Sequence, residues 1–202
     1  MSEVNQPEKT KTEIQLVRDC AAILIPHGIP ITMVKGENIN VMQQLGGSFT
    51  VYYNGNLARI DGKDADALGL AVPQDYSSNT NDQTSVDMKI VGDGLVDEED
   101  VWAKLKTCYD PEIPVNIVDL GLIYECDVHP IEPGNIEAGN CAIIKMTLTA
   151  PGCGMGPYIV DDVKRKVLEI PNIFDAKVEL IWDPPWGQDM MSEEAQLTLG
   201  LL

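Results

Sequence analysis

Cys153 is the residue of this sequence whose surroundings best suit thiol chemistry. It lies in the run from Thr149 to Pro157, where three glycines leave the backbone free to adopt positive φ angles. A helix is predicted just after it, and a helix N-terminus directs free N–H groups and about half a positive charge toward the preceding turn. A thiol there ionises more readily, and the thiolate is both a nucleophile and a soft-metal ligand. The alternative is a plain strand-to-helix turn in which Cys153 fills a small space.

The other four cysteines are expected to be buried hydrophobic residues: Cys20, Cys108, Cys126 and Cys141. A zinc site needs four ligands at local spacings, and the five cysteines and two histidines offer no such set. The cysteine count is odd, and the polar N-terminus does not resemble a signal peptide. Both features predict reduced thiols in a cytoplasmic protein.

A second cluster runs from Asp110 to Leu122, where two prolines and a glycine impose an irregular loop. Its carboxylates include Glu112 and Asp119. Asp119 comes just before a predicted strand, where it could cap the helix after Cys153, orient the thiol or hold a proton. Capping alone is the alternative interpretation.

The segment from Trp182 to Trp186 places two tryptophans beside a pair of prolines. Exposed tryptophans in such segments cover a pocket or dock a partner. Packing over the edge of a sheet is an equally open interpretation.

Residues 95–202 carry the periodicity of a small α/β sandwich. Asp97 is a suitable N-cap for a helix that Tyr109 and Asp110 are expected to end, because a residue before proline disfavours the helical region. The later elements are strands near 122–128 and 142–148, a helix at 157–170, a strand at 176–182 and a short helix after Ser192. Asp161 and Asp162 are expected to complement the positive end of the second helix. The order helix, strand, strand, helix, strand predicts a three-stranded mixed sheet.

Residues 12–71 are predicted to form short strands cut by turns, in a small barrel or sandwich. Asn54-Gly55 is typical of a tight hairpin turn. Residues 72–94 are predicted to be a polar linker, since the run from Pro73 to Ser85 cannot bury enough apolar area to offset the cost of ordering it. The predicted fold class is therefore α+β: a small all-β N-terminal domain, then an α-β-β-α-β domain.

Composition excludes two classes of partner. The 202 residues include 32 acidic and 14 basic residues, for a net charge of -18. Nucleic acid is excluded as a partner because phosphate binding needs clustered basic residues. The single basic cluster, Lys164 to Lys166, is interpreted as a solvated helix face. No membrane partner is expected, since no apolar run approaches the roughly 20 residues that span a bilayer.

Three ordered motifs make the chain similar to a known family: the Asp110–Leu122 loop, the Thr149–Cys153 turn and the Asp183–Trp186 segment. Together they resemble the PaaD/SufT-type iron–sulfur assembly domain family over about Leu95 to Asp189. Further stretches, including Arg18–Cys20, are similar to the SufT subgroup along nearly the whole chain. The resemblance implies an auxiliary role in maturing iron–sulfur proteins, in the SUF system, with Cys153 as the key thiol.

We therefore predict a non-enzymatic factor with Cys153 as its metal ligand. Residues expected to support the thiol or contact a partner are Asp110, Glu112, Asp119, Thr149, Gly152, Gly154 and Trp186. The cargo would be a transient iron–sulfur cluster, or iron, bound through Cys153. Because a cluster usually takes four ligands, a homodimer, or a scaffold, carrier or client apo-protein, would supply the others.

Two other functions stay open at this point. The first is a pure adaptor that docks client proteins without binding metal. The second is a thiol enzyme, for which the only candidate base is Asp119, a weak one. The N-terminal segment could dock partners or mask the cysteine turn.

Overall fold

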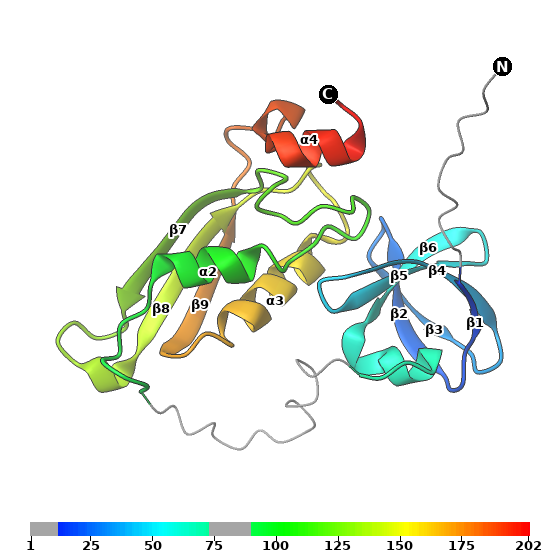
Figure 1. The fold of residues 1–202 in the computed structure, drawn as a ribbon, viewed down its shortest axis with the longest axis horizontal. Coiled ribbons are helices and arrows are strands. Elements are labelled where there is room, and N and C mark those ends of the chain that lie inside the picture. The colour runs from blue at the N-terminus through cyan, green and yellow to red at the C-terminus, as the bar shows by residue number, and fades with distance from the viewer. Residues whose placement is uncertain (1–11, 73–89) are drawn as a thin grey trace. The chain divides into compact units, whose positions relative to one another are not determined.

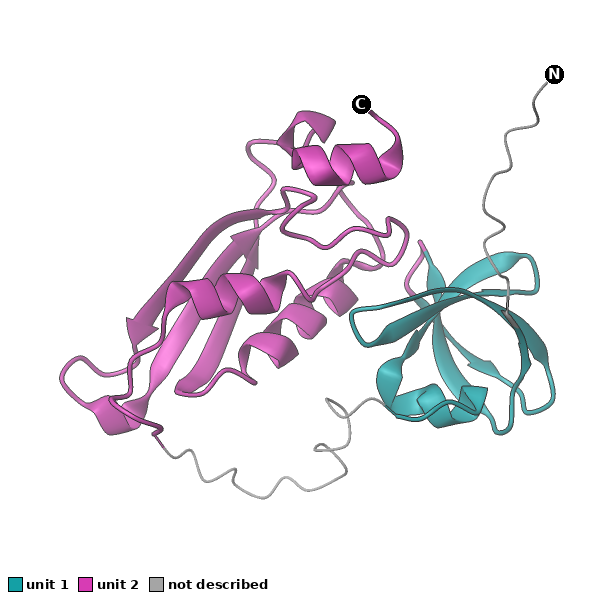
Figure 2. Ribbon diagram, viewed as in Figure 1, with its two compact units in different colours: residues 1–25, 29–80 teal, residues 26–28, 81–202 magenta. Residues whose placement is uncertain are grey.

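The computed structural model describes residues 12–72 and 90–202. The chain divides into two compact units, residues 1–25 with 29–80 and residues 26–28 with 81–202 (Figure 2). The central part of the predicted linker, from Pro73 to Ser85, lies outside the described residues.

In the described residues of unit 1, six strands form one antiparallel sheet in the order β1-β4-β5-β6-β2-β3 (Figure 1). Its elements are β1 (Thr12–Gln15), β2 (Cys20–Ile25), β3 (Ile29–Met33), β4 (Asn38–Leu45), β5 (Ser48–Tyr53), β6 (Asn56–Asp61) and the 3-10 helix η1 (Gly62–Leu68). The predicted all-β domain is confirmed, as one sheet and not a two-sheet sandwich. Asn54 and Gly55 both have positive φ, at 46° and 85°, as the type I′ hairpin turn between β5 and β6 requires.

The core of unit 1 follows from strand alternation. Phe49 pairs with Ile60 and Val51 with Ala58 across β5 and β6, and all four side chains are buried. Because side chains alternate between the two faces of a strand, these pairs define the inner face of the sheet.

Unit 2 has the predicted order of helix, strand, strand, helix, strand. It contains α2 (Glu98–Leu105), β7 (Ile123–Pro130), η2 (Ile136–Ala138), β8 (Asn140–Met146), α3 (Gly156–Val167), β9 (Ile173–Leu180), η3 (Gln188–Met190) and α4 (Glu193–Leu199). β7 pairs with β8 antiparallel and β8 with β9 parallel, so the sheet is mixed as predicted. α2 packs on β7, α3 on β9, and the two helices on each other (Figure 1).

Local signals explain where these helices begin. The Asp97 carboxylate accepts a hydrogen bond from the Glu99 N–H at 3.0 Å, and the Ser192 hydroxyl accepts one from the Ala195 N–H at 3.2 Å. The predicted N-cap Asp97 is thus present, and Ser192 caps the predicted last helix. In the described parts of the chain, no helix has the length and apolar character needed to cross a membrane.

Four expectations about the ends of elements are wrong. β8 ends at Met146 and not at 148, and α3 ends at Val167 and not at 170. α2 ends at Leu105 and not at Tyr109, because the chain leaves the helix through turns and Tyr109 forms an isolated bridge with Asn116. β9 ends at Leu180, so Trp182 lies beyond the strand.

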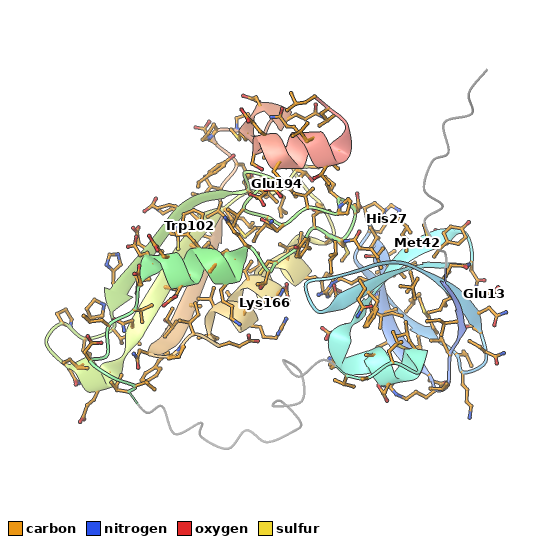
Figure 3. The ribbon with its side chains drawn as sticks, in the orientation of Figure 1. Glu13, His27, Met42, Trp102, Lys166 and Glu194 are labelled. Atoms are coloured by element: carbon orange, nitrogen blue, oxygen red, sulfur yellow. The ribbon has the colours of Figure 1, made fainter. Side chains whose placement is uncertain are left out.

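The expected solvation of the basic cluster is wrong for Lys166, which is buried on α3 (Figure 3). Its ammonium lies 2.9 Å from the Asp162 carboxylate and donates to the Thr107 carbonyl at 2.6 Å. Asp162 also pairs with Arg165 at 2.6 Å. The first turn of α3 holds no acidic residue. Asp162 therefore forms ion pairs with Arg165 and Lys166 and does not complement the positive end of the helix.

Candidate functional site

The Cys153 turn joins the end of β8 to the start of α3. Gly152 adopts a φ of +78°, which an L side chain rarely tolerates. The turn closes through the Cys153 N–H, which donates to the Ala150 carbonyl at 3.3 Å. Thr149 and Gly154 flank the turn and are half-buried.

Cys153 differs from the other cysteines in its exposure. It is half-buried, whereas Cys20, Cys108, Cys126 and Cys141 are all buried, as predicted. Burial raises the pKa of Cys20 and Cys126 to about 11 and that of Cys108 to about 12. Burial also raises the pKa of Cys141. The four buried residues are therefore neutral thiols at pH 7, and Cys153 is the one cysteine that solvent or a partner reaches.

The start of α3 offers Cys153 fewer N–H groups than the sequence suggested. Gly156 N–H donates back to the Cys153 carbonyl at 3.1 Å, and Pro157 has no N–H. The N–H groups of Tyr158 and Ile159 both donate to the Met155 carbonyl. The expectation of free N–H groups aimed at the turn is thus wrong for these four positions.

Asp110 organises the start of the neighbouring loop. Its carboxylate is buried and accepts hydrogen bonds from the N–H groups of Glu112, at 2.8 Å, and Ile113, at 2.9 Å. Burial raises its pKa despite these two bonds, which favour the charged form. Glu112 is exposed, and its pKa is raised by partial desolvation and by the charge of Asp110.

Asp119 is held by a short turn of its own. Its carboxylate accepts from the Asn116 amide at 2.6 Å, while Asn116 Oδ1 accepts from the N–H groups of Val118 and Asp119. This reciprocal pattern resembles a capping box and caps the turn that starts at Asn116, not α3. Sequence reasoning missed Asn116, although its three-residue spacing from Asp119 is a readable signal.

The C-terminal segment is bonded to the loop that carries Asp119. Trp186 Nε1 donates to the Leu120 carbonyl at 2.8 Å, and the Ser192 N–H donates to the Asp119 carbonyl at 2.9 Å. Gly121 has a φ of +71°, and a Cβ there would overlap the Met190 carbonyl. Trp186 is therefore a half-buried packing residue in this segment, whereas Trp182 is 44% exposed.

The structure brings the predicted residues together only in part. Cys153, Ile113 and Trp186 all pack against one hydrophobic core, which ties the cysteine turn, the Asp110 loop and the C-terminal segment into one domain. Among the described residues, no side-chain hydrogen bond or ion pair joins Cys153 to Asp110, Glu112 or Asp119. The same residues contain no group of three or more His, Cys, Asp or Glu side chains placed to hold a metal ion.

The fold and the cysteine turn define a small α-β-β-α-β domain with one accessible thiol. The family model of iron–sulfur cluster assembly proteins matches residues 98–180. A Fe–S protein maturation auxiliary factor of Porphyromonas gingivalis is 46% identical over 108 residues, covering 54% of this chain and 95% of that protein. The chain therefore belongs to the iron–sulfur cluster assembly family.

Two further proteins are similar to this chain. The Fe–S protein maturation auxiliary factor SufT of Staphylococcus aureus is 46% identical over 92 residues, covering 46% of this chain and 96% of that protein. A crystal structure of a domain of unknown function from Bacillus anthracis is 40% identical, with a TM-score of 0.42 over 52% of this chain and 92% of that one. The two auxiliary factors confirm the predicted SufT-type resemblance over about half of the chain. The likeness of the N-terminal stretches to that subgroup stays a prediction.

Proposed function

We propose that this protein is an auxiliary factor that holds an iron–sulfur unit through the Cys153 thiolate and passes it to client apo-proteins. The observation that carries the proposal is the contrast among the cysteines. Four are buried with raised pKa values, and Cys153 alone is accessible in a glycine-containing turn before a helix. Family membership supplies the class of cargo.

The remaining ligands come from a second chain. Iron–sulfur clusters usually take four ligands, and the described residues contain no group of three or more His, Cys, Asp or Glu side chains placed to hold a metal. A second copy, a scaffold or carrier protein, or the client itself would complete the set. Transfer is then a ligand exchange in which a client thiol forms its bond to iron, the bond from iron to Cys153 breaks, and the client's proton passes to Cys153.

The supporting residues act mainly on the shape of this site. Gly152 sets the turn, Asp110 fixes its loop, and Trp186 fixes the C-terminal segment against Leu120. Asp119 is engaged by Asn116, which leaves its carboxylate poorly suited to act as a base. This engagement favours a carrier over a thiol enzyme.

Anaerobic reconstitution with iron and sulfide tests the proposal. Wild type is compared with Cys153→Ser and with Cys141→Ser, a matched change at a buried cysteine. We expect wild type and Cys141→Ser to take up iron and sulfide and Cys153→Ser to take up little. The mass of the loaded species in solution identifies a dimer. Equal uptake by all three proteins would refute the role of Cys153 as the ligand, whereas no uptake by any of them would favour the adaptor that binds no metal.

A further inference from the structure

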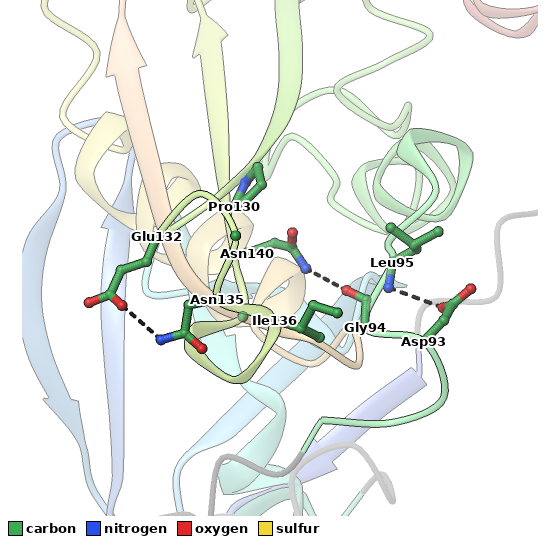
Figure 4. A pocket seen from close by; sticks show the side chains of 10 residues that line it. Asp93, Gly94, Leu95, Pro130, Glu132, Asn135, Ile136 and Asn140 are labelled. Atoms are coloured by element: carbon green, nitrogen blue, oxygen red, sulfur yellow. Dashed lines mark hydrogen bonds between the residues drawn. The ribbon is translucent and has the colours of Figure 1, made fainter.

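Unit 2 contains a small pocket at the end of its sheet where β8 begins, whereas the Cys153 turn follows the other end of β8. The pocket has a volume of about 120 Å³. It is lined by the chain just before α2 and by the loop between β7 and β8, including Leu95, Glu132, Ile136 and Asn140 (Figure 4). None of the comparisons or the chemistry proposed above gives this pocket a role.

The walls of the pocket are fixed by specific contacts. The Asn140 amide donates to the Gly94 carbonyl at 2.9 Å, and the Asp93 carboxylate accepts from the Leu95 N–H at 3.1 Å. On the opposite wall the Asn135 amide donates to Glu132 at 2.8 Å. The Asn140 bond joins the two lining segments, and the other two bonds are local to one segment each.

Apolar side chains are unusually exposed here. Leu95 is 76% exposed and Ile136 is 63% exposed, and both line the pocket. Val91 and Ile131, close to them in the sequence, are 60% and 43% exposed. Exposed aliphatic side chains that line a concave site are a feature of protein interaction surfaces.

The size of the pocket selects the kind of occupant. Sites for cofactors and drug-sized ligands run from about 300 to 1,000 Å³, so a whole cofactor does not fit. A cavity of about 150 Å³ holds a benzene molecule, so this pocket suits a single leucine-sized side chain.

The charge around the pocket indicates which residues should flank the aliphatic side chain of the partner. The carboxylates of Asp93 and Glu132 lie on opposite sides of the apolar residues Leu95 and Ile136 (Figure 4). None of the described lining residues is a lysine or an arginine. A partner with basic residues beside its apolar anchor would therefore gain ion pairs at both sides.

We propose that this pocket docks a partner polypeptide through one aliphatic side chain flanked by lysine or arginine. A second copy of this chain, with 32 acidic against 14 basic residues, matches the carboxylates of Asp93 and Glu132 less well than a basic segment does. Residues 73–89 of the chain itself are also poorly matched, with three aspartates against one lysine. The proposal does not depend on Cys153 as a metal ligand.

Nuclear magnetic resonance titration of the full-length protein with short synthetic peptides tests this docking site. The probe is a heptapeptide with a central leucine between paired lysines. Its two controls carry serine in place of the leucine, or glutamates in place of the lysines. We expect amide shifts confined to residues 91–95 and 130–140, with a dissociation constant on the order of 1 mM for so small an anchor. Both control peptides should bind at least about tenfold more weakly.

Matched protein variants separate the pocket from the general negative charge of the chain. Glu132→Lys should weaken the lysine peptide about threefold or more, while Glu193→Lys, an exposed acid on α4, should leave these shifts unchanged. Leu95→Ala should weaken it, whereas Leu197→Ala, another exposed leucine, should not. Three outcomes would each overturn the proposal. They are amide shifts spread over the surface, equal binding of the serine and leucine peptides, and pocket shifts that grow with protein concentration alone.

Discussion

Gly121→Ala is the most informative single change in the loop that carries Asp119. Gly121 has a φ of +71°, so an alanine there costs about 1 kcal/mol in backbone strain. The new Cβ would also overlap the Met190 carbonyl, a backbone group that cannot rotate away. The C-terminal segment must then move.

The size of the loss follows from the bonds that this movement breaks. The Ser192 N–H bond to Asp119 and the Trp186 Nε1 bond to Leu120 hold the segment, at 2.9 and 2.8 Å. Each is worth about 1 kcal/mol, so the expected total loss in the free energy of unfolding is about 3 kcal/mol. A strain-only effect would be about 1 kcal/mol.

Urea unfolding followed by tryptophan fluorescence measures this loss. All three tryptophans lie in unit 2, so the signal reports that unit alone. Gly134→Ala is the matched control, because Gly134 has a φ of +87° and nothing within 4 Å of its added Cβ. Equal losses for the two variants would refute the argument that Gly121 is needed for close approach. An unshifted emission maximum for Gly121→Ala would show that Trp186 stays in place.

Three further predictions concern unit 2. Lys166→Met should lower the free energy of unfolding by about 1–2 kcal/mol. Asp162→Ala should lower it by about 3 kcal/mol, because this change leaves the buried Lys166 ammonium without its carboxylate partner. A larger loss for Lys166→Met than for Asp162→Ala in urea unfolding would contradict this order. The raised pKa of Asp110 means that stability is full below its ordinary value of 3.8 and falls as pH rises through the folded value. Asp110→Asn should therefore gain stability relative to wild type as pH increases from 4 to 7. If urea unfolding showed the variant losing stability relative to wild type over this range, the buried carboxylate would not be the source of the pH dependence. Iodoacetamide should label Cys153 first at pH 7 and the other four cysteines only on unfolding, and peptide mass spectrometry showing uniform labelling would contradict their burial.

The elements of the fold were largely predictable because their signals are local. Asp97 and Ser192 cap helices through bonds to residues two or three positions away, and alternation marked all three strands of unit 2. The burial of Cys126 agrees with the same alternation, whereas Cys141 is buried although it is out of phase with the face of Ala142 and Ile144.

What could not be predicted depends on contacts between distant residues. Lys166 can be buried because the Thr107 carbonyl, 59 positions earlier, accepts a hydrogen bond from its ammonium. Trp186 packs inward because Leu120, 66 positions earlier, offers a carbonyl. No local pattern distinguishes these side chains from solvated ones. Asn116 is different, since its spacing from Asp119 could have revealed the turn that holds this carboxylate.

The two proposed sites lie at opposite ends of one strand, and this arrangement has a functional consequence. β8 has seven residues and so spans roughly 20 Å between the pocket near Asn140 and the approach to the Cys153 turn. A partner anchored in the pocket would therefore leave the thiol uncovered unless it extends along the sheet or the helices. Lysine-peptide binding should accordingly leave the iodoacetamide reaction rate of Cys153 unchanged, whereas a complete scaffold or client that donates ligands must slow it. A short peptide that protected Cys153 would show that the pocket and the thiol are coupled through the core.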